Sequence, residues 1–139
     1  MLKFGIMVMP QHPRTDSPVK RFRETVELTH LARDAGFHSI ACGQHFLSPP
    51  YQNLQSMPLL ARLAADSGSM DLILSILLLP LCNPVQVAED VASIDVISEG
   101  RVVFGVGLGY RDIEYEAFNT NRRERTSRFL EALEVIQRL

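Results

Sequence analysis

The first residue of this chain that could take part in catalysis is a histidine in a short polar segment. His45 stands in the segment GQHFL, which directly follows an apolar run at residues 37–42. An imidazole at the end of a strand can donate a hydrogen bond to a carbonyl group or carry a proton near neutral pH. His45 is therefore a candidate catalytic residue, and the alternative is a histidine that only caps or decorates a surface loop.

A glycine-rich segment, GVGLGY at residues 105–110, is the second candidate. Glycines let the chain turn sharply and let a planar ligand approach the backbone closely. A dinucleotide-binding fingerprint would need a glycine where Tyr110 stands, and it would follow the first strand rather than the fourth. The segment is therefore either a ligand-binding turn or a tight turn between a strand and a helix without a ligand.

The other reactive side chains predict no separate site. Cys42 and Cys82 have neither CxxC nor zinc-ligand spacing, and a free cysteine after a strand usually behaves as a small buried hydrophobe. The remaining histidines are not arranged for metal binding. Residues 111–118 predict a short helix on which Arg111 and Glu114 could pair at the surface for little energy.

The elements that must position these residues alternate between strand and helix. Short apolar runs predict four strands, at residues 4–8, 37–42, 72–79 and 102–106. The third run is apolar almost without alternation, as expected of a strand buried on both faces of a parallel sheet. The strand starts recur at roughly the 30-residue length of a βαβ unit.

Helix signals fill the intervals between the strands. Ser17-Pro18 and Asn83-Pro84 each place a capping side chain before a proline, which predicts helices at 18–35 and from 84 to about 97. Two further helices are predicted by apolar residues at helical spacing. The first carries Leu59, Leu60, Leu63 and Ala64, and the second carries Phe129, Leu133 and Ile136.

Four βα units predict an α/β fold that is the N-terminal half of a (β/α)8 TIM-type barrel, with residues 1–139 as a single partial domain. A complete barrel takes roughly 250 residues and keeps its active site at the C-terminal ends of its strands. His45 and the segment at 105–110 are expected at those ends. Periodicity alone also allows a different barrel enzyme or an open doubly wound sheet, because four units do not say whether the sheet closes.

Composition and hydropathy indicate the class of the protein, its location and its partners. Hydrophobic residues make up 46%, charged residues 22%, and the formal net charge is -2, which is typical of a soluble globular protein and predicts no nucleic-acid partner. The longest apolar run is well short of the roughly 20 residues that span a bilayer. No charged leader precedes the first strand, so we expect a cytoplasmic location. A four-stranded open sheet would expose its edges and its inner face, so we expect a homo-oligomer.

Three segments together resemble the bacterial luciferase-like monooxygenase family of flavin and deazaflavin oxidoreductases. They are GQHF at 43–46, residues 83–101 with ASIDVISEGR at their end, and GVGLGYR at 105–111 continuing to Glu114 and Phe118. The resemblance implies that the strand ends hold FMN or a deazaflavin ring, which a reduced nicotinamide or another donor reduces. A small organic substrate or oxygen would then react with the reduced ring.

The resemblance also implies roles for single residues. His45 would lie beside the ring or the substrate as a hydrogen-bond donor or proton shuttle. The strand end around Leu79 and Pro80 and the turn Gly107-Leu108-Gly109 would line the ring pocket. Gln44 stands where many family members carry an acidic residue, so a carboxylate that orients the histidine is missing from that position.

Two expectations follow for the chain by itself. Barrel phosphate sites are commonly built by the loops after strands 7 and 8, so this chain should bind a phosphorylated flavin weakly and should be inactive alone. The competing hypothesis is a non-catalytic half barrel that self-associates, or that docks on a partner chain through the predicted terminal helix.

Overall fold

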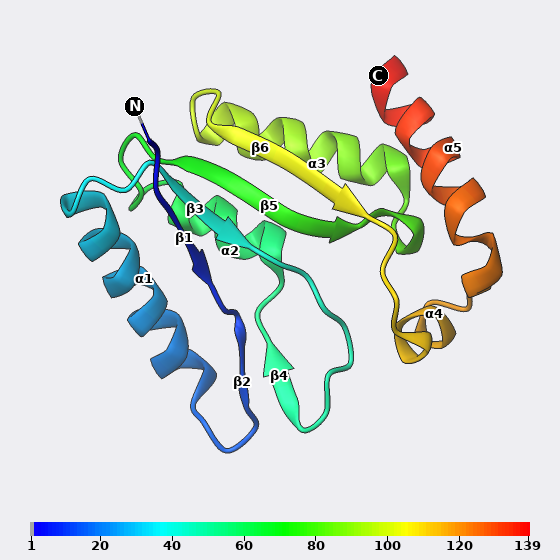
Figure 1. Ribbon diagram of the computed structural model, residues 1–139, viewed down its shortest axis with the longest axis horizontal. Coiled ribbons are helices and arrows are strands. Elements are labelled where there is room, and N and C mark those ends of the chain that lie inside the picture. Colours follow the sequence, from blue (N-terminus) through cyan, green and yellow to red (C-terminus); the bar gives the residue numbers. More distant parts are fainter. Residues whose placement is uncertain (1) are drawn as a thin grey trace.

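A four-stranded parallel sheet forms the centre of the computed structural model, which describes residues 2–139 (Figure 1). Its strands are β1 (Gly5–Val8), β3 (Ser39–Cys42), β5 (Asp71–Leu78) and β6 (Val102–Gly107). They lie side by side in the order β1-β3-β5-β6, which is also their order along the chain. A doubly wound sheet reverses this order at a switch point. The observed order is therefore that of a barrel wall.

Helices connect the strands and cover one face of the sheet (Figure 1). The connecting helices are α1 (Pro18–Asp34), α2 (Ser56–Leu63) and α3 (Pro84–Ile97). The 3-10 turn η1 (Leu79–Leu81) follows β5, and the short helix α4 (Asp112–Ala117) follows β6. A second 3-10 turn, η2 (Arg122–Glu124), leads into α5 (Arg125–Arg138), which contacts α3 and η1. Among the helices of residues 2–139, none is long and apolar enough to cross a membrane.

The two predicted helix caps are confirmed. The Ser17 hydroxyl accepts the Lys20 backbone N–H at 3.3 Å. The Asn83 side-chain oxygen accepts the N–H groups of Val85 at 3.0 Å and of Gln86 at 3.3 Å. These bonds satisfy donors that the first turn of a helix leaves without partners. A proline follows each cap, so α1 and α3 begin at the predicted residues.

The two faces of the sheet differ in burial, because successive side chains on a strand point to opposite sides. On the helix side, Ile40 and Leu72 are paired in register and are both 0% exposed. The next row points to the other face and consists of Met7, Ala41, Ile73 and Val103. In this row Met7 is 52% exposed and Val103 is 45% exposed. One face is thus the packed core and the other is open, as expected for the inner wall of a half barrel.

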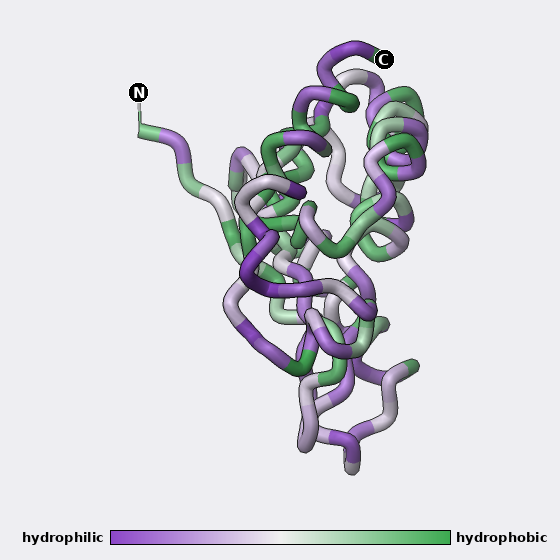
Figure 2. The backbone as a smooth tube through the Cα atoms, turned by 90° about the vertical axis from the view of Figure 1, so that its right-hand side faces the viewer, coloured by the Kyte–Doolittle hydropathy of each residue, from purple (hydrophilic) through white to green (hydrophobic). Residues whose placement is uncertain are grey.

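A small antiparallel sheet differs from the sequence prediction. β2 (Gln11–Pro13) pairs with β4 (Tyr51–Asn53), and both lie outside the four strands that the sequence predicted. Each strand has three residues, too few to show a two-residue alternation. Figure 2 shows mostly hydrophilic stretches at this lower end of the molecule and hydrophobic ones in its body. The small sheet lies beyond the C-terminal ends of β1 and β3, next to the predicted site (Figure 1).

Arg101 fastens two loops at the opposite, N-terminal edge of the main sheet. Its guanidinium donates to the carbonyl oxygens of Ser98 at 2.6 Å, Met70 at 2.7 Å and Ala64 at 3.0 Å. It also donates to the Ser67 hydroxyl at 2.8 Å. The segment after α2 and the segment after α3 are therefore joined through one side chain.

Replacing Arg101 with methionine should lower the free energy of unfolding by about 1–3 kcal/mol, because acceptors in the two loops would lose their donors. Urea unfolding followed by circular dichroism measures this change. The matched control is Arg138→Met on α5, whose side chain is 75% exposed and pairs with Glu134. The control should change stability by less than about 0.5 kcal/mol. Equal effects of the two substitutions would contradict the conclusion that Arg101 stabilises the fold by joining the two loops.

Candidate active site

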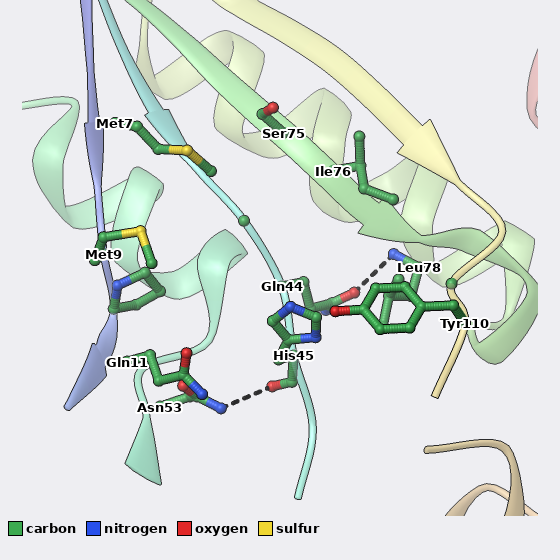
Figure 3. A pocket seen from close by; sticks show the side chains of 13 residues that line it. Met7, Met9, Gln11, Gln44, His45, Asn53, Ser75, Ile76, Leu78 and Tyr110 are labelled. Atoms are coloured by element: carbon green, nitrogen blue, oxygen red, sulfur yellow. Dashed lines mark hydrogen bonds between the residues drawn. The ribbon is translucent and has the colours of Figure 1, made fainter. Parts of the chain in front are cut away.

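A cavity of about 220 Å³ opens at the C-terminal edge of the main sheet, where the sequence placed the site. Its walls are mostly apolar and include Met7, Met9, Ile76, Leu78 and Tyr110. Five polar side chains also line it, namely Gln11, Gln44, His45, Asn53 and Ser75. Figure 3 shows the two methionines on one side, Ile76 on the other, and the histidine between them. The cavity therefore combines apolar walls with a few polar groups, which is the usual composition of a small-molecule site.

An irregularity in β5 shapes one wall of the cavity. The pairing of β5 with β6 shifts register just after Leu74, and the Ser75-Ile76 peptide bond there is cis. Two glycines of β6 let the strands approach at this point. A Cβ on Gly105 would lie 2.3 Å from the Leu74 carbonyl oxygen, and one on Gly107 would lie 2.1 Å from Ile76 Cδ1. Glycine at 107 thus leaves Ile76 the space that it occupies beside the cavity.

Gln44 joins the ends of two strands beneath the cavity. Its side-chain oxygen accepts the backbone N–H of Leu78 at 2.9 Å (Figure 3). The side chain at the position where the resemblance implied an acidic residue is therefore bound to β5.

The ring of His45 is held by Glu114, a residue that lies 69 positions further along the chain. His45 Nδ1 is 3.1 Å from Glu114 Oε1, and the Glu114 side chain is only 1% exposed. The same oxygen accepts the Phe46 backbone N–H at 2.9 Å. The carboxylate that is missing at position 44 is thus supplied by α4.

Arg111 fixes the segment that follows His45. Its guanidinium donates to the carbonyl oxygens of Phe46 at 3.1 Å and Leu47 at 3.2 Å, and to the Ser48 hydroxyl at 2.7 Å. It also lies 3.5 Å from the Glu114 carboxylate. The predicted pairing of Arg111 with Glu114 is present, but its expected location at the surface is wrong, because the Glu114 side chain is buried.

The backbone of His45 is held separately by the small sheet and the residues after it. The side-chain amides of Asn53 and Gln55 both donate to the His45 carbonyl oxygen, at 3.3 and 3.2 Å. The ring meets Tyr110 edge-on, with centroids 6.2 Å apart. Within residues 2–139, Nε2 of His45 makes no hydrogen bond, and the side chain is 36% exposed. His45 therefore offers one ring nitrogen to a molecule in the cavity.

The family model described as luciferase-like monooxygenase matches residues 2–139. The chain belongs to the luciferase-like monooxygenase family. It is 27% identical over 122 residues to the oxygenase component of a flavin-dependent trigonelline monooxygenase from Acinetobacter baylyi, which covers 83% of this chain and 32% of that protein. The chain thus spans about a third of the length of the curated relatives it matches.

Two solved structures show the same fold. The oxygenating constituent of 3,6-diketocamphane monooxygenase from Pseudomonas putida, solved with FMN, superposes with a TM-score of 0.90 at 18% identity and covers 99% of this chain and 39% of that one. An F420-dependent secondary alcohol dehydrogenase, solved with an F420-acetone adduct, gives a TM-score of 0.79 at 20% identity, covering 97% and 41%. With the sequential strand order, these likenesses confirm the predicted half of a TIM-type barrel.

The luciferase-like resemblance named six site residues, and the structure brings two of them to the cavity. His45 and Gly109 line it directly, and Gly109 has φ +75°, which favours glycine. Gly107 borders Ile76 instead, and the Leu108 carbonyl accepts the Tyr115 hydroxyl.

Leu79 and Pro80 lie away from the cavity. Both residues belong to η1, and the Leu79 side chain packs in a buried cluster with Val87 of α3 and Ala132 of α5. The Pro80 carbonyl accepts Nε of Arg128 at 2.9 Å. Ser75, Ile76 and Leu78 form the β5 side of the cavity in their place.

The apolar stripe of the terminal helix α5 packs against other parts of the same chain. Phe129, Leu133 and Ile136 are partly buried against the cluster that contains Leu77 and Leu79. The predicted docking of a partner through this stripe is therefore not supported, because the side chains pack against the sheet layer of their own chain.

The two cysteines should resist alkylation in the folded luciferase-like chain. Burial raises the pKa of Cys42 to about 12 and that of Cys82 to about 11. The thiolate is the reactive form, so raising the pKa lowers the reactive fraction at about pH 8. Mass spectrometry after iodoacetamide treatment should show slow labelling of the folded chain and rapid labelling in urea. Rapid labelling of Cys42 without urea would contradict the buried, unreactive assignment.

Proposed function

We propose that this chain supplies part of the active site of a flavin- or deazaflavin-dependent oxidoreductase that acts on a small organic substrate. The observation that carries the proposal is His45, whose free Nε2 faces an apolar cavity at the C-terminal edge of the sheet. In this proposal His45 exchanges a proton or a hydrogen bond with the cofactor ring or the substrate.

The residues of the cavity fit a planar, mostly apolar ring. Met7, Met9 and Ile76 offer adaptable apolar contacts, since the methionine thioether adjusts to flat surfaces. Gly43 lets the main chain after β3 lie close to β5, because a Cβ at this position would lie 3.0 Å from the Ser75 carbonyl oxygen. A bound flavin or deazaflavin would supply the redox chemistry, and the protein would orient the ring and exclude water.

The charge of the cavity supports weak binding of a phosphorylated cofactor by this chain. None of the described residues that line it is lysine or arginine. The volume of about 220 Å³ is also below the roughly 300 Å³ at which whole-ligand pockets begin. We therefore propose that the chain holds the ring, and that the phosphate arm finds its cation on residues that do not line this cavity.

We propose that the cofactor is either a flavin or a deazaflavin, because solved relatives carry one or the other. One solved relative carries FMN and another carries an F420 adduct. The substrate differs between them, so the proposal is limited to a small organic molecule. The reduced-nicotinamide donor and the cytoplasmic location stay predictions from the sequence.

Titration with riboflavin, read by quenching of flavin fluorescence, tests the proposal. We expect saturable binding with similar affinities for riboflavin and FMN, because the cavity offers no cation to the phosphate. Ile76→Trp should fill the cavity and weaken binding by about tenfold or more, equivalent to about 1.4 kcal/mol. The control Val96→Trp lies on α3 at a side chain that is 79% exposed and should bind as the parent does.

Two outcomes would contradict the ring-binding proposal. One is the absence of saturable quenching by riboflavin in a chain that is folded by circular dichroism. The other is equal binding by the Ile76→Trp variant and the parent, which would place the flavin elsewhere on the chain.

We also propose that the isolated chain self-associates through the open face of its sheet. Met7 and Val103 are half-exposed there, and β1 and β6 are the unpaired edges of the main sheet. Exposed apolar patches and free strand edges favour association with a second copy.

Sedimentation velocity tests this association. The parent chain at about 100 µM should sediment as a dimer or larger species, because burial of exposed apolar surface favours association. Val103→Glu places a charge in the open row and should shift the chain towards monomer. The control Val96→Glu, on the helix side, should leave the distribution unchanged. A monomeric parent chain at this concentration would contradict the proposal.

A further inference from the structure

We infer that Glu114 is the positioning residue of His45, and that it fixes the imidazole in the tautomer whose Nε2 accepts a proton from the cavity. The inference rests on the proposed role of His45 and goes beyond it, because it assigns the direction of proton transfer and the residue that sets it. The observation that carries it is a convergence of donors on a single buried oxygen, Glu114 Oε1.

The donors around this oxygen decide which nitrogen of His45 carries the proton. Glu114 Oε1 accepts the backbone N–H of Phe46 at 2.9 Å and faces the guanidinium of Arg111 at 3.5 Å. Groups of this kind only donate, so Oε1 presents lone pairs to its neighbours. Nδ1 of His45, 3.1 Å away, is therefore the donor in this contact. A neutral imidazole with its proton on Nδ1 carries its lone pair on Nε2.

Glu114 is buried on its own side of this contact. Its side chain is 1% exposed, and the following residue, Tyr115, is 2% exposed and bonded through its hydroxyl to the Leu108 carbonyl. The second carboxylate oxygen, Oε2, is buried without a hydrogen-bond partner among residues 2–139. Burying a carboxylate that is only half satisfied opposes folding. The structure thus holds a half-satisfied carboxylate directly against the imidazole of His45.

The proton step balances without a further reactant. Nε2 takes a proton from an O–H or N–H group of a molecule in the cavity, which is left as its conjugate base. The ring then carries a positive charge that faces the Glu114 carboxylate, and it returns the proton from Nε2 later. Arg111, which contacts the same carboxylate, and Tyr110, whose ring centroid is 6.2 Å away, also lie beside the ring.

The loop that carries His45 has enough other contacts to remain in place without the carboxylate. Arg111 donates to the two carbonyl groups and the hydroxyl of residues 46–48. The amides of Asn53 and Gln55 hold the carbonyl of His45. Removal of the Glu114 carboxylate therefore frees the ring more than it frees the backbone, which allows a test that separates positioning from anchoring.

Long-range 15N NMR of the imidazole rings provides that test, because the two ring nitrogens have different shifts in the two tautomers. Spectra are recorded on this chain at mildly alkaline pH, and the His45 signals are assigned by their loss in His45→Gln. The parent should show a proton on Nδ1 and none on Nε2. Glu114→Gln should keep this tautomer, because its amide oxygen still accepts. Glu114→Leu should shift the tautomer ratio by about tenfold towards Nε2–H.

The matched control is Glu116→Leu, an exposed position on the same helix, and it should leave the His45 signals unchanged. A parent ring protonated on Nε2 would overturn the inference, and that result needs no variant to fold. An unchanged tautomer ratio in a folded Glu114→Leu chain would also overturn it. The tautomer is read without a flavin, so failure of riboflavin binding and failure of this inference are separate results.

Discussion

All four strands of the main sheet run in the same direction, and this constraint organises the whole molecule. Segments that follow parallel strands must begin at one edge of the sheet. The loop after β3 and the loop after β6 therefore meet in space, although His45 and Glu114 are 69 residues apart. Their contact, the clamp by Arg111 and the cavity all lie at this edge. A single topological rule thus brings together the residues that could do chemistry.

The N-terminal and C-terminal ends of the strands have different roles. At the N-terminal edge, Arg101 joins loops through bonds to main-chain carbonyls and a hydroxyl, which stabilises the fold. At the C-terminal edge, polar side chains instead hold one another in place around an apolar hollow. This division is typical of barrel enzymes, in which stability and chemistry occupy opposite ends of the strands.

Local signals predicted the fold because they act over a few residues. The caps at Ser17 and Asn83 and the apolar run of β5 determine their elements almost alone. The small sheet was not predictable in this way, since its three-residue strands pair across forty positions. Glu114 was noted only as a motif residue with a surface partner. Its burial against His45 is a tertiary contact, and no local pattern reports such a contact.

A planar cofactor ring bound at the C-terminal edge beside His45 is the proposal on which the function assigned to this chain depends. Methyl NMR of a chain labelled at methionine and isoleucine, titrated with riboflavin, tests it most directly. We expect the signals of Met7, Met9 and Ile76 to shift together and saturate, while those of Met70 in the core and Ile97 on α3 stay fixed. Shifts confined to Ile97 or spread evenly over the methyl groups would contradict it.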